Sequence, residues 1–200
     1  MAIDAKAIVK AESRLRIMKK SSAELQSIVT KEDFSDTWYT FLVACKNIWT
    51  SLEQGSKSTA QDRHWFGAKK GERKSDELLQ YLFISRDNDE HSIEQVTDRT
   101  PGGLAIGGPE KGYSRSIQIN GTIGAGGTLI ATSLDDKPVL VKKISPKFIL
   151  STVTGRDKNV PFSPPSMHKG EKIHNPNPID VANLAITYFE TLIEEARALE

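Results

Sequence analysis

The sequence predicts an α+β protein, in which a four-helix bundle carries a small antiparallel β-rich insertion between its third and fourth helices. Two observations predict this class. Long segments near both ends of the chain place apolar residues at helical spacing. The middle of the chain instead holds most of the glycine and proline, with short β-branched runs between turn signals. We therefore expect residues 1–98 and 177–200 to form the bundle and residues 99–176 to form the insertion.

The first two helices are predicted from their apolar periodicity. Residues 3–30 are rich in good helix formers, and their apolar side chains recur at helical spacing. A second helix should begin near Asp33 or Ser35, either of which is a favourable N-cap, and end at Gly55. Its wide apolar stripe, from Trp38 to Leu52, indicates that one face is buried.

The third helix is expected to begin after Ser75 and to continue to about Val96. Asp76 and Glu77 would occupy its first turn, where the helix dipole favours anionic side chains. The preceding segment, residues 55–74, is polar and basic and contains one apolar anchor, Trp65-Phe66. We interpret it as a connection rather than as a helix.

The β-rich insertion is predicted from four β-branched runs, at residues 116–119, 128–132, 139–144 and 148–153. A proline-rich loop follows, and the last helix begins with Asn177 as N-cap and Pro178 at the first helical position. Its wide apolar face needs partners, which favours an insertion within one bundle. The alternative is two domains that divide near residue 98.

Composition excludes several classes of protein. Lys and Arg total 27 and Asp and Glu total 26, so the chain is no polybasic tail protein, although a local basic patch is compatible with this balance. The only cysteine, Cys45, lies on an apolar stripe, so we expect a core residue and no internal disulfide. No apolar run approaches the roughly 18 residues of a membrane span. From its charged N-terminal segment we expect no signal peptide, and we expect a cytoplasmic location.

Arg86 occupies an unusual position on the third predicted helix. At about 100° per residue it falls on the apolar stripe, in line with Leu79 and Leu82. A charged side chain on such a stripe is nearly always paired, or it points into a cavity or a partner. One interpretation is an interior ion pair between Arg86 and a carboxylate on this or another helix, with His91 as an ordinary surface residue.

A second interpretation comes from the run Arg86-Asp87-Asn88-Asp89-Glu90-His91. An arginine followed directly by a polar residue, and separated from a histidine by four to six residues, resembles the signature of the HEPN superfamily of helical ribonucleases. Here four residues lie between Arg86 and His91. This is the only match in the chain. The tryptophans Trp38 and Trp65, together with Arg73 and the run from Ser75 to Leu82, are also similar to a small-protein variety of that group. The chain departs from many toxin members at Ile93, where they carry a tyrosine.

The resemblance implies a metal-independent endoribonuclease, or an RNA-binding relative, that acts in defence or stress response as a homodimer. Arg86 would stabilise the phosphate and His91 would transfer protons, because histidine titrates near neutrality and arginine is always charged. Asp87 would orient His91, and Asn88 would hydrogen-bond the phosphate or the sugar. No cofactor is expected. The alternative function is a non-catalytic interaction module, in which Arg86 and His91 are structural and the β-rich insertion binds a protein partner.

Three other patterns carry weaker predictions. Cations and an aromatic alternate in the basic segment at Arg63, Trp65, Lys69, Lys70, Arg73 and Lys74, which is typical of RNA contacts. A solvated loop held by Trp65 is the alternative interpretation there. The glycine-rich stretch 121–127 is followed by a strand-like run, so we interpret it as turns rather than as a dinucleotide site. His168 and His174 lack enough accompanying ligands to predict a zinc site.

Overall fold

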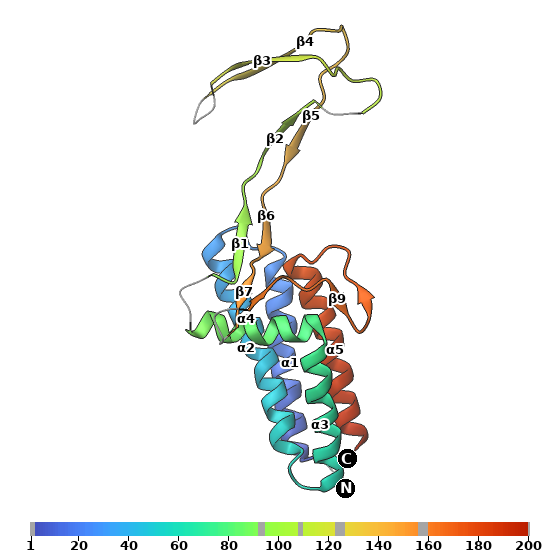
Figure 1. Ribbon diagram of the computed structural model, residues 1–200. Helices are drawn as coiled ribbons and strands as arrows, with labels where there is room; N and C mark the ends of the chain where they lie inside the picture. Colours follow the sequence, from blue (N-terminus) through green and yellow to red (C-terminus); the bar gives the residue numbers. More distant parts are fainter. Residues whose placement is uncertain (1–2, 92–94, 108–109, 123–126, 156–159, 200) are drawn as a thin grey trace. The chain divides into compact units, whose positions relative to one another are not determined.

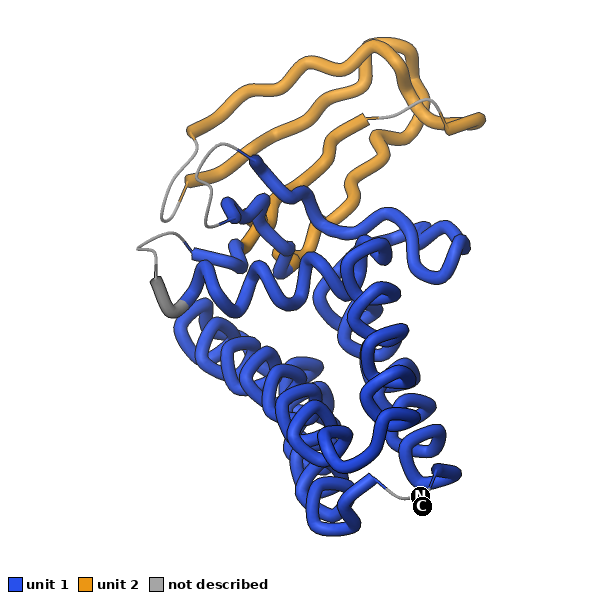
Figure 2. The backbone as a smooth tube through the Cα atoms, turned by 60° about the horizontal axis from the view of Figure 1, so that its bottom comes forward, with its two compact units in different colours: residues 1–98, 148–200 blue, residues 99–147 orange. Residues whose placement is uncertain are grey.

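The computed structural model describes residues 3–91, 95–107, 110–122, 127–155 and 160–199, with the side chains of residues 90 and 91 excepted. The chain divides into two compact units (Figure 2). Residues 1–98 and 148–200 form unit 1, and residues 99–147 form unit 2. The second boundary therefore lies near residue 147, whereas the sequence placed it at residue 176.

The described residues form five helices, which corrects the predicted four-helix bundle with an insertion between its third and fourth helices. The helices are α1 (Ala5–Leu25), α2 (Lys31–Gly55), α3 (Ala60–Ser75), α4 (Glu77–His91) and α5 (Pro178–Ala198). The additional helix is α3, which occupies the segment interpreted as a polar connection. Thr59 begins it with a capping box, in which Thr59 and Asp62 each bond the other's backbone. The β-rich segments consequently lie between α4 and α5.

The helices of unit 1 do not all run in the same direction. α1, α2, α3 and α5 lie roughly alongside one another, and α4 lies across one end of them (Figure 1). The turn between α3 and α4 is sharp because Asp76 separates the two helices and caps the second. Its carboxylate accepts a hydrogen bond from the backbone N–H of Leu79 at 3.0 Å.

One apolar core joins these helices. Its largest fully buried side chains include Trp38 and Trp49 on α2, Tyr81 on α4 and Phe189 on α5. Cys45 is buried in this core, as predicted, and burial raises the pKa of its thiol. The predicted start of the last helix is also confirmed, since the Asn177 side chain accepts from the backbone N–H of Ile179 and Asp180.

The strands form five two-stranded pairs. The strands are β1 (Thr97–Thr100), β2 (Gly103–Ile106), β3 (Ile117–Gly121), β4 (Leu129–Ser133), β5 (Val141–Ile144), β6 (Lys147–Leu150), β7 (Val153–Thr154), β8 (Pro161–Phe162), β9 (Met167–His168) and β10 (Glu171–Lys172). β1 pairs with β6, and β2 with β5, β3 with β4, β7 with β8 and β9 with β10 pair antiparallel. The four predicted β-branched runs overlap β3, β4, β5 and β6.

The segment after residue 147 belongs to the helical unit. Leu150, Val153 and Ile173 are buried in the common core. The phenol of Tyr81 on α4 donates a hydrogen bond to the carbonyl of Ser151 at 2.7 Å. Apolar burial and this hydrogen bond therefore both fix the segment to the helices.

Unit 2 differs from unit 1 in having little buried apolar surface among its described residues. Among its described residues no large apolar side chain is buried, and Ser114 is its only buried polar residue. Seven large apolar side chains there are exposed: Leu104, Ile119, Leu129, Ile130, Leu134, Val141 and Ile144. Its strand pairs are thus held mainly by backbone hydrogen bonds rather than by a core. Within the described residues, no helix is both long and apolar enough to cross a membrane.

Candidate functional site

Two cations from different helices meet at the Phe83 ring of α4. The Arg73 guanidinium carbon lies 4.5 Å from the centre of that ring. The ammonium of Lys46, on α2, lies 5.1 Å from the same centre. Arg73 also lies 4.9 Å from the centre of the Trp49 ring. These distances are typical of cation–π contacts, which hold both side chains beside the partly buried Phe83.

Arg86 completes a group of three cations, which we call the basic cluster: Lys46, Arg73 and Arg86. The charge of Arg86 acts on Lys46, whose pKa is lowered. Burial is the largest cause of the lowered pKa. Among the neighbouring charges Asp87 has the largest effect and raises the pKa, Arg73 and Arg86 lower it, and Glu53 raises it. Arg73 on α3 and Arg86 on α4 thus lie close enough to disfavour the positive charge of Lys46 on α2.

The Arg86 side chain is 22% exposed and pairs with Asp87, with 3.1 Å between the guanidinium and the carboxylate. The sequence left open whether Arg86 forms an ion pair, and the structure shows this pair with its own neighbour. Asp87 and Glu53 both act on Lys46 with the opposite charge. Neither Lys46 nor Arg73 has a carboxylate within ion-pair distance in the part of the chain that the structure describes.

The other residues of the predicted catalytic run have different surroundings. Asn88 is buried, and its amide donates a hydrogen bond to the carbonyl of Thr154 at 3.0 Å. This hydrogen bond links α4 to β7. The Asn88 amide therefore holds these two elements together and does not face solvent. His91 is the last residue of α4, and its side chain lies outside the described atoms. Ile93 also lies outside the described residues.

The six residues predicted to contact RNA lie on α3, and helical geometry separates them. Trp65 is half-buried and donates from its indole to the carboxylate of Glu195 on α5, at 3.3 Å. Lys69 points to the same helix and pairs with Glu195 at 2.7 Å. These two residues stabilise the α3–α5 contact. Arg73 joins the basic cluster, and Lys74 is exposed in the last turn of α3.

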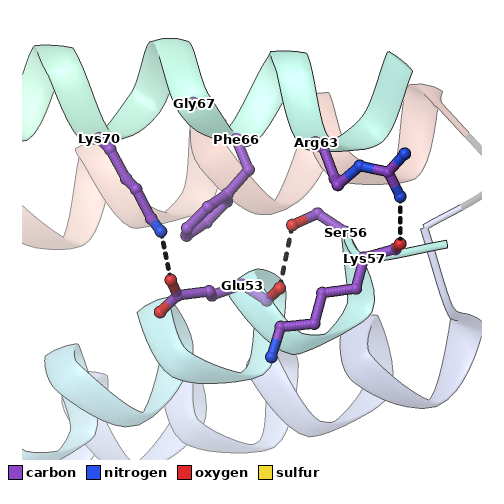
Figure 3. A pocket seen from close by; sticks show the side chains of 7 residues that line it. All are labelled: Glu53, Ser56, Lys57, Arg63, Phe66, Gly67 and Lys70. Carbon is purple, nitrogen blue, oxygen red and sulfur yellow. Dashed lines mark hydrogen bonds and ion pairs between the residues drawn. The ribbon is translucent and has the colours of Figure 1, made fainter. Parts of the chain in front are cut away.

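The remaining two, Arg63 and Lys70, line a pocket between α2 and α3 (Figure 3), which we call the α2–α3 pocket. Its volume is about 260 Å³, and it is lined by Glu53, Ser56, Lys57, Arg63, Phe66, Gly67 and Lys70. Lys70 forms an ion pair with Glu53. One Arg63 guanidinium nitrogen donates to the backbone carbonyl of Lys57 at 2.8 Å. Three cations and one carboxylate therefore surround this pocket.

A row of aromatic rings connects the α2–α3 pocket to the basic cluster. Phe66, which lines the pocket, lies 4.9 Å from Trp49 between ring centres. Trp49 in turn lies 5.4 Å from Phe83. Phe66 and Trp49 are buried, so they support the cations above them rather than offer surfaces for stacking. The ammonium of Lys70 lies 5.5 Å from the centre of Phe66.

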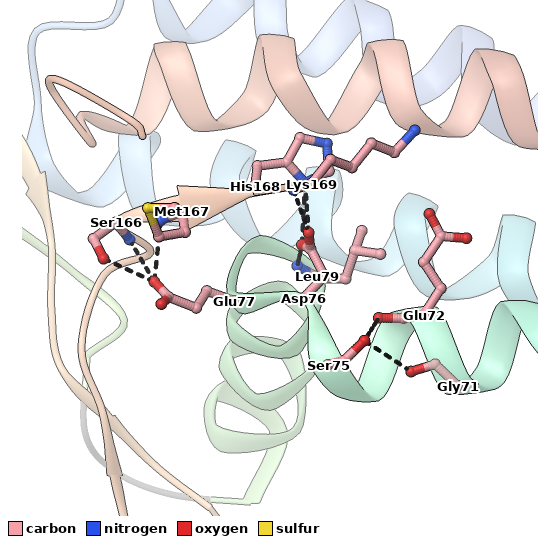
Figure 4. Close-up of polar contacts among 10 residues, drawn as sticks. All are labelled: Gly71, Glu72, Ser75, Asp76, Glu77, Leu79, Ser166, Met167, His168 and Lys169. Carbon is pink, nitrogen blue, oxygen red and sulfur yellow. Dashed lines mark hydrogen bonds and ion pairs between the residues drawn. The ribbon is translucent and has the colours of Figure 1, made fainter. Parts of the chain in front are cut away.

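A second polar group lies at the start of α4 (Figure 4). Asp76 accepts from the His168 ring nitrogen Nδ1 at 3.0 Å and from the backbone N–H of Lys169 at 2.8 Å. Glu77 accepts from the backbone N–H groups of Ser166 and Met167. The two carboxylates thereby fix the chain around β9 to α4. His168 therefore has a structural partner, and within the described residues no group of three or more His, Cys, Asp or Glu side chains could hold a metal ion.

Sequence reasoning missed several residues of this arrangement. Lys46 and Lys57 lie on or just beyond α2, and no spacing rule relates them to α3 or α4. The signal for α3 was present in the Thr59-x-x-Asp62 capping box, but two glycines and few apolar residues concealed it. The glycine-rich stretch 121–127 is only partly described, since residues 123–126 lie outside the described ranges.

No family model, curated protein or solved structure that was compared with the chain matches it.

Proposed function

We propose that the chain binds single-stranded RNA through the basic cluster and cleaves it with Arg86 and His91. The observation that carries the proposal is the convergence of Lys46, Arg73 and Arg86 from three helices, with Asp87 and Glu53 as opposing charges that act on Lys46. Positive charges that lie close together repel one another, and a bound anion relieves that repulsion. A cluster of cations is therefore expected at a site that binds an anionic ligand. A phosphodiester provides such a ligand, because guanidinium groups bind its non-bridging oxygens through two parallel hydrogen bonds.

The proposed reaction is an internal transesterification. The ribose 2′-oxygen attacks the adjacent phosphorus while its proton passes to a general base, and the bond from phosphorus to the 5′-oxygen breaks. That oxygen leaves with a proton supplied by a general acid. The products are a 2′,3′-cyclic phosphate and a free 5′-hydroxyl, and the step needs no other reactant. Histidine suits either proton transfer, because its ordinary pKa lies near neutrality.

The roles of the residues follow from this reaction. Arg86 would bind the phosphate as negative charge grows on its oxygens, and Asp87 would hold the guanidinium in place. Arg73 and Lys46 would contact the same phosphate or its neighbour. His91 follows Arg86 by five residues on α4 and is assigned the proton transfer from its resemblance to the HEPN signature. By the same resemblance we propose that two copies act together, which sedimentation at micromolar concentration would test.

The test is cleavage of a labelled single-stranded RNA in the presence of EDTA. We expect Arg86→Ala and His91→Ala to abolish cleavage, and a substrate with a 2′-deoxy sugar at the cleaved position to be inert. Arg73→Gln should weaken binding and reduce the slope of log affinity against log salt by about 0.7, the value for one phosphate contact on a single strand. Arg16→Gln is the matched control, since Arg16 is an exposed arginine on α1.

The outcomes separate this proposal from its alternative. Loss of cleavage in folded Arg86→Ala and His91→Ala proteins supports catalysis. RNA binding without cleavage in the wild type would retain the binding function and remove the enzymatic one. Absence of RNA binding would favour a non-catalytic interaction module, for which the exposed apolar side chains of unit 2 are the supporting observation.

A further inference from the structure

The α2–α3 pocket has the chemistry of an anion site. Lys57, Arg63 and Lys70 contribute three positive charges, and Glu53 contributes the only negative charge among its lining residues. The Arg63 guanidinium has five N–H donors. One of its nitrogens donates a hydrogen bond to the backbone carbonyl of Lys57. That contact fixes the guanidinium beside Lys57 (Figure 3). Arg63 is exposed, so its other donors can reach a ligand.

One wall of the α2–α3 pocket belongs to α3, the helix that also carries Arg73 of the basic cluster. Arg63 and Arg73 are ten positions apart, which at 1.5 Å per residue is about 15 Å along α3. Stacked nucleotides advance about 3.4 Å each along one strand, so this separation corresponds to about four nucleotides of a stacked strand and to fewer of an extended one. One RNA strand along α3 would therefore reach both places.

We infer that the α2–α3 pocket binds a second backbone phosphate of the same RNA strand, within about four nucleotides of the phosphate at the basic cluster. This inference rests on the proposed RNA-binding function and specifies its ligand. The preferred ligand is then an oligonucleotide with several phosphates, and a dinucleotide, which has a single phosphodiester, would occupy only one of the two places. The ion pair between Lys70 and Glu53 would open when the phosphate replaces the carboxylate.

Gly67 gives a way to close the pocket without changing its charge. It is exposed, and a Cβ atom built on it would meet no heavy atom within 4 Å. Because Gly67 lines the pocket, a leucine there would add a bulky side chain at its wall. It should also favour the helix, since glycine is unfavourable in a helix interior relative to alanine and leucine. The variant is therefore expected to fold.

Gly71 provides the matched control. It lies one turn further along α3, is exposed, and a Cβ atom there would also meet no heavy atom within 4 Å. It does not line the α2–α3 pocket. Gly67→Leu and Gly71→Leu therefore make the same chemical change on the same helix, and only the first should obstruct the pocket.

The experiment measures the affinity of the full chain for 2′-O-methyl oligonucleotides of two, four, six and eight residues, which resist cleavage. For the wild type we expect a steep rise in affinity between two and six residues. Gly67→Leu should weaken binding of the eight-residue oligonucleotide about tenfold, while raising thermal stability. Its effect on the dinucleotide should be at least five times smaller. Arg63→Gln should reproduce this dependence on length, and Gly71→Leu should match the wild type.

Three results would overturn the inference. The first is wild-type affinity that does not increase with length. The second is a Gly67→Leu protein that binds the longest oligonucleotide as well as Gly71→Leu does. The third is a loss in Gly67→Leu that is equal at every length. Failure of the proposed function is recognised differently, because the wild type would then bind no oligonucleotide of any length, and both conclusions would fall together.

Discussion

The carboxylate of Asp76 lies 3.0 Å from Nδ1 of His168, although 92 positions separate the two residues in the sequence. The Asp76 side chain is 7% exposed and the His168 side chain 11%. The same carboxylate accepts from the backbone N–H of Leu79 and of Lys169. A single side chain therefore caps α4 and holds the β9 segment against it.

These contacts predict a specific loss of stability in acid. Burial acts to raise the pKa of Asp76, but hydrogen bonds from Lys169, Leu79 and His168 outweigh it, so the pKa falls below its usual value of 3.8. A lowered pKa in the folded state means that the stabilisation is complete above the unfolded pKa. It is lost as the pH falls through the folded pKa, which places the window below about pH 4.

Asp76→Asn should remove most of this dependence. Asparagine can still cap α4, but it loses the charge that favours the His168 contact, so we expect a loss of about 1–2 kcal/mol at neutral pH. Urea unfolding at pH 7, 4 and 3 measures the effect, and the variant should lose less stability than the wild type over this range. Glu194→Gln is the control, since Glu194 is an exposed carboxylate on α5. Parallel pH profiles for Asp76→Asn and the wild type would contradict the assignment.

A second prediction concerns Lys46, whose charge is expected to lower the free energy of unfolding. Its pKa is lowered, so its charge is less favourable in the folded chain than in the unfolded chain, and stability should rise as the pH rises toward 10.5, its usual pKa. Lys46→Met keeps the aliphatic length beside Phe83 and removes the charge. Solvent screening and the loss of the cation–π contact with Phe83 reduce this gain, so we expect the free energy of unfolding at pH 7 to increase by less than about 0.5 kcal/mol, together with weaker RNA binding.

Lys10→Met is the matched control for this prediction, because Lys10 is an exposed lysine on α1. It should change neither stability nor binding appreciably. If Lys46→Met instead destabilises the chain with no change in RNA affinity, then Lys46 supports the packing of Phe83 and has no part in the site.

The sequence predicted most helices because their apolar periodicity reflects burial directly. α2 and α5 illustrate this, with stripes that become core at Trp49 and Phe189. It failed at α3 because that helix buries only Asp62 and Phe66, so its pattern resembles a solvated loop. Its helical state depends on the capping box at Thr59 and on contacts with Glu53 and Glu195, which are distant in sequence.

The candidate site was predictable only in part, for a related reason. Arg86 was recognisable because a charge on an apolar stripe is unusual within one helix. The basic cluster, in contrast, requires that α2, α3 and α4 meet at Phe83, and no local pattern specifies that Lys46 and Arg73 share one ring. Asn88 depends on tertiary structure in the same way: the family resemblance predicted a contact to the phosphate or the sugar, and its hydrogen bond to the carbonyl of Thr154 on β7 could not be inferred from the sequence.

The last prediction concerns which part of the β-rich segment the helices require. Thr100 and Lys147 lie side by side, since the hydroxyl of Thr100 donates to the carbonyl of Lys147 and accepts from its N–H, both at 3.1 Å. A two-residue Asn-Gly turn can therefore replace residues 101–146 and close β1 and β6 into a hairpin. Because the described part of unit 2 buries no large apolar side chain, we expect this shortened chain to unfold cooperatively, within about 1 kcal/mol of the wild type.

A longer deletion, residues 101–176, should behave differently. It removes Leu150, Val153 and Ile173 from the core, and with them the contacts that Asp76 and Tyr81 make to this segment. Each buried apolar side chain contributes about 1.5–3 kcal/mol, so the loss should reach about 5 kcal/mol or more and abolish cooperative unfolding. Denaturation of both chains in urea, followed by circular dichroism, compares them directly. Equal stability of the two would mean that residues 147–176 are dispensable to the core, and loss of cooperativity in the shorter deletion would mean that unit 2 is required by the helices.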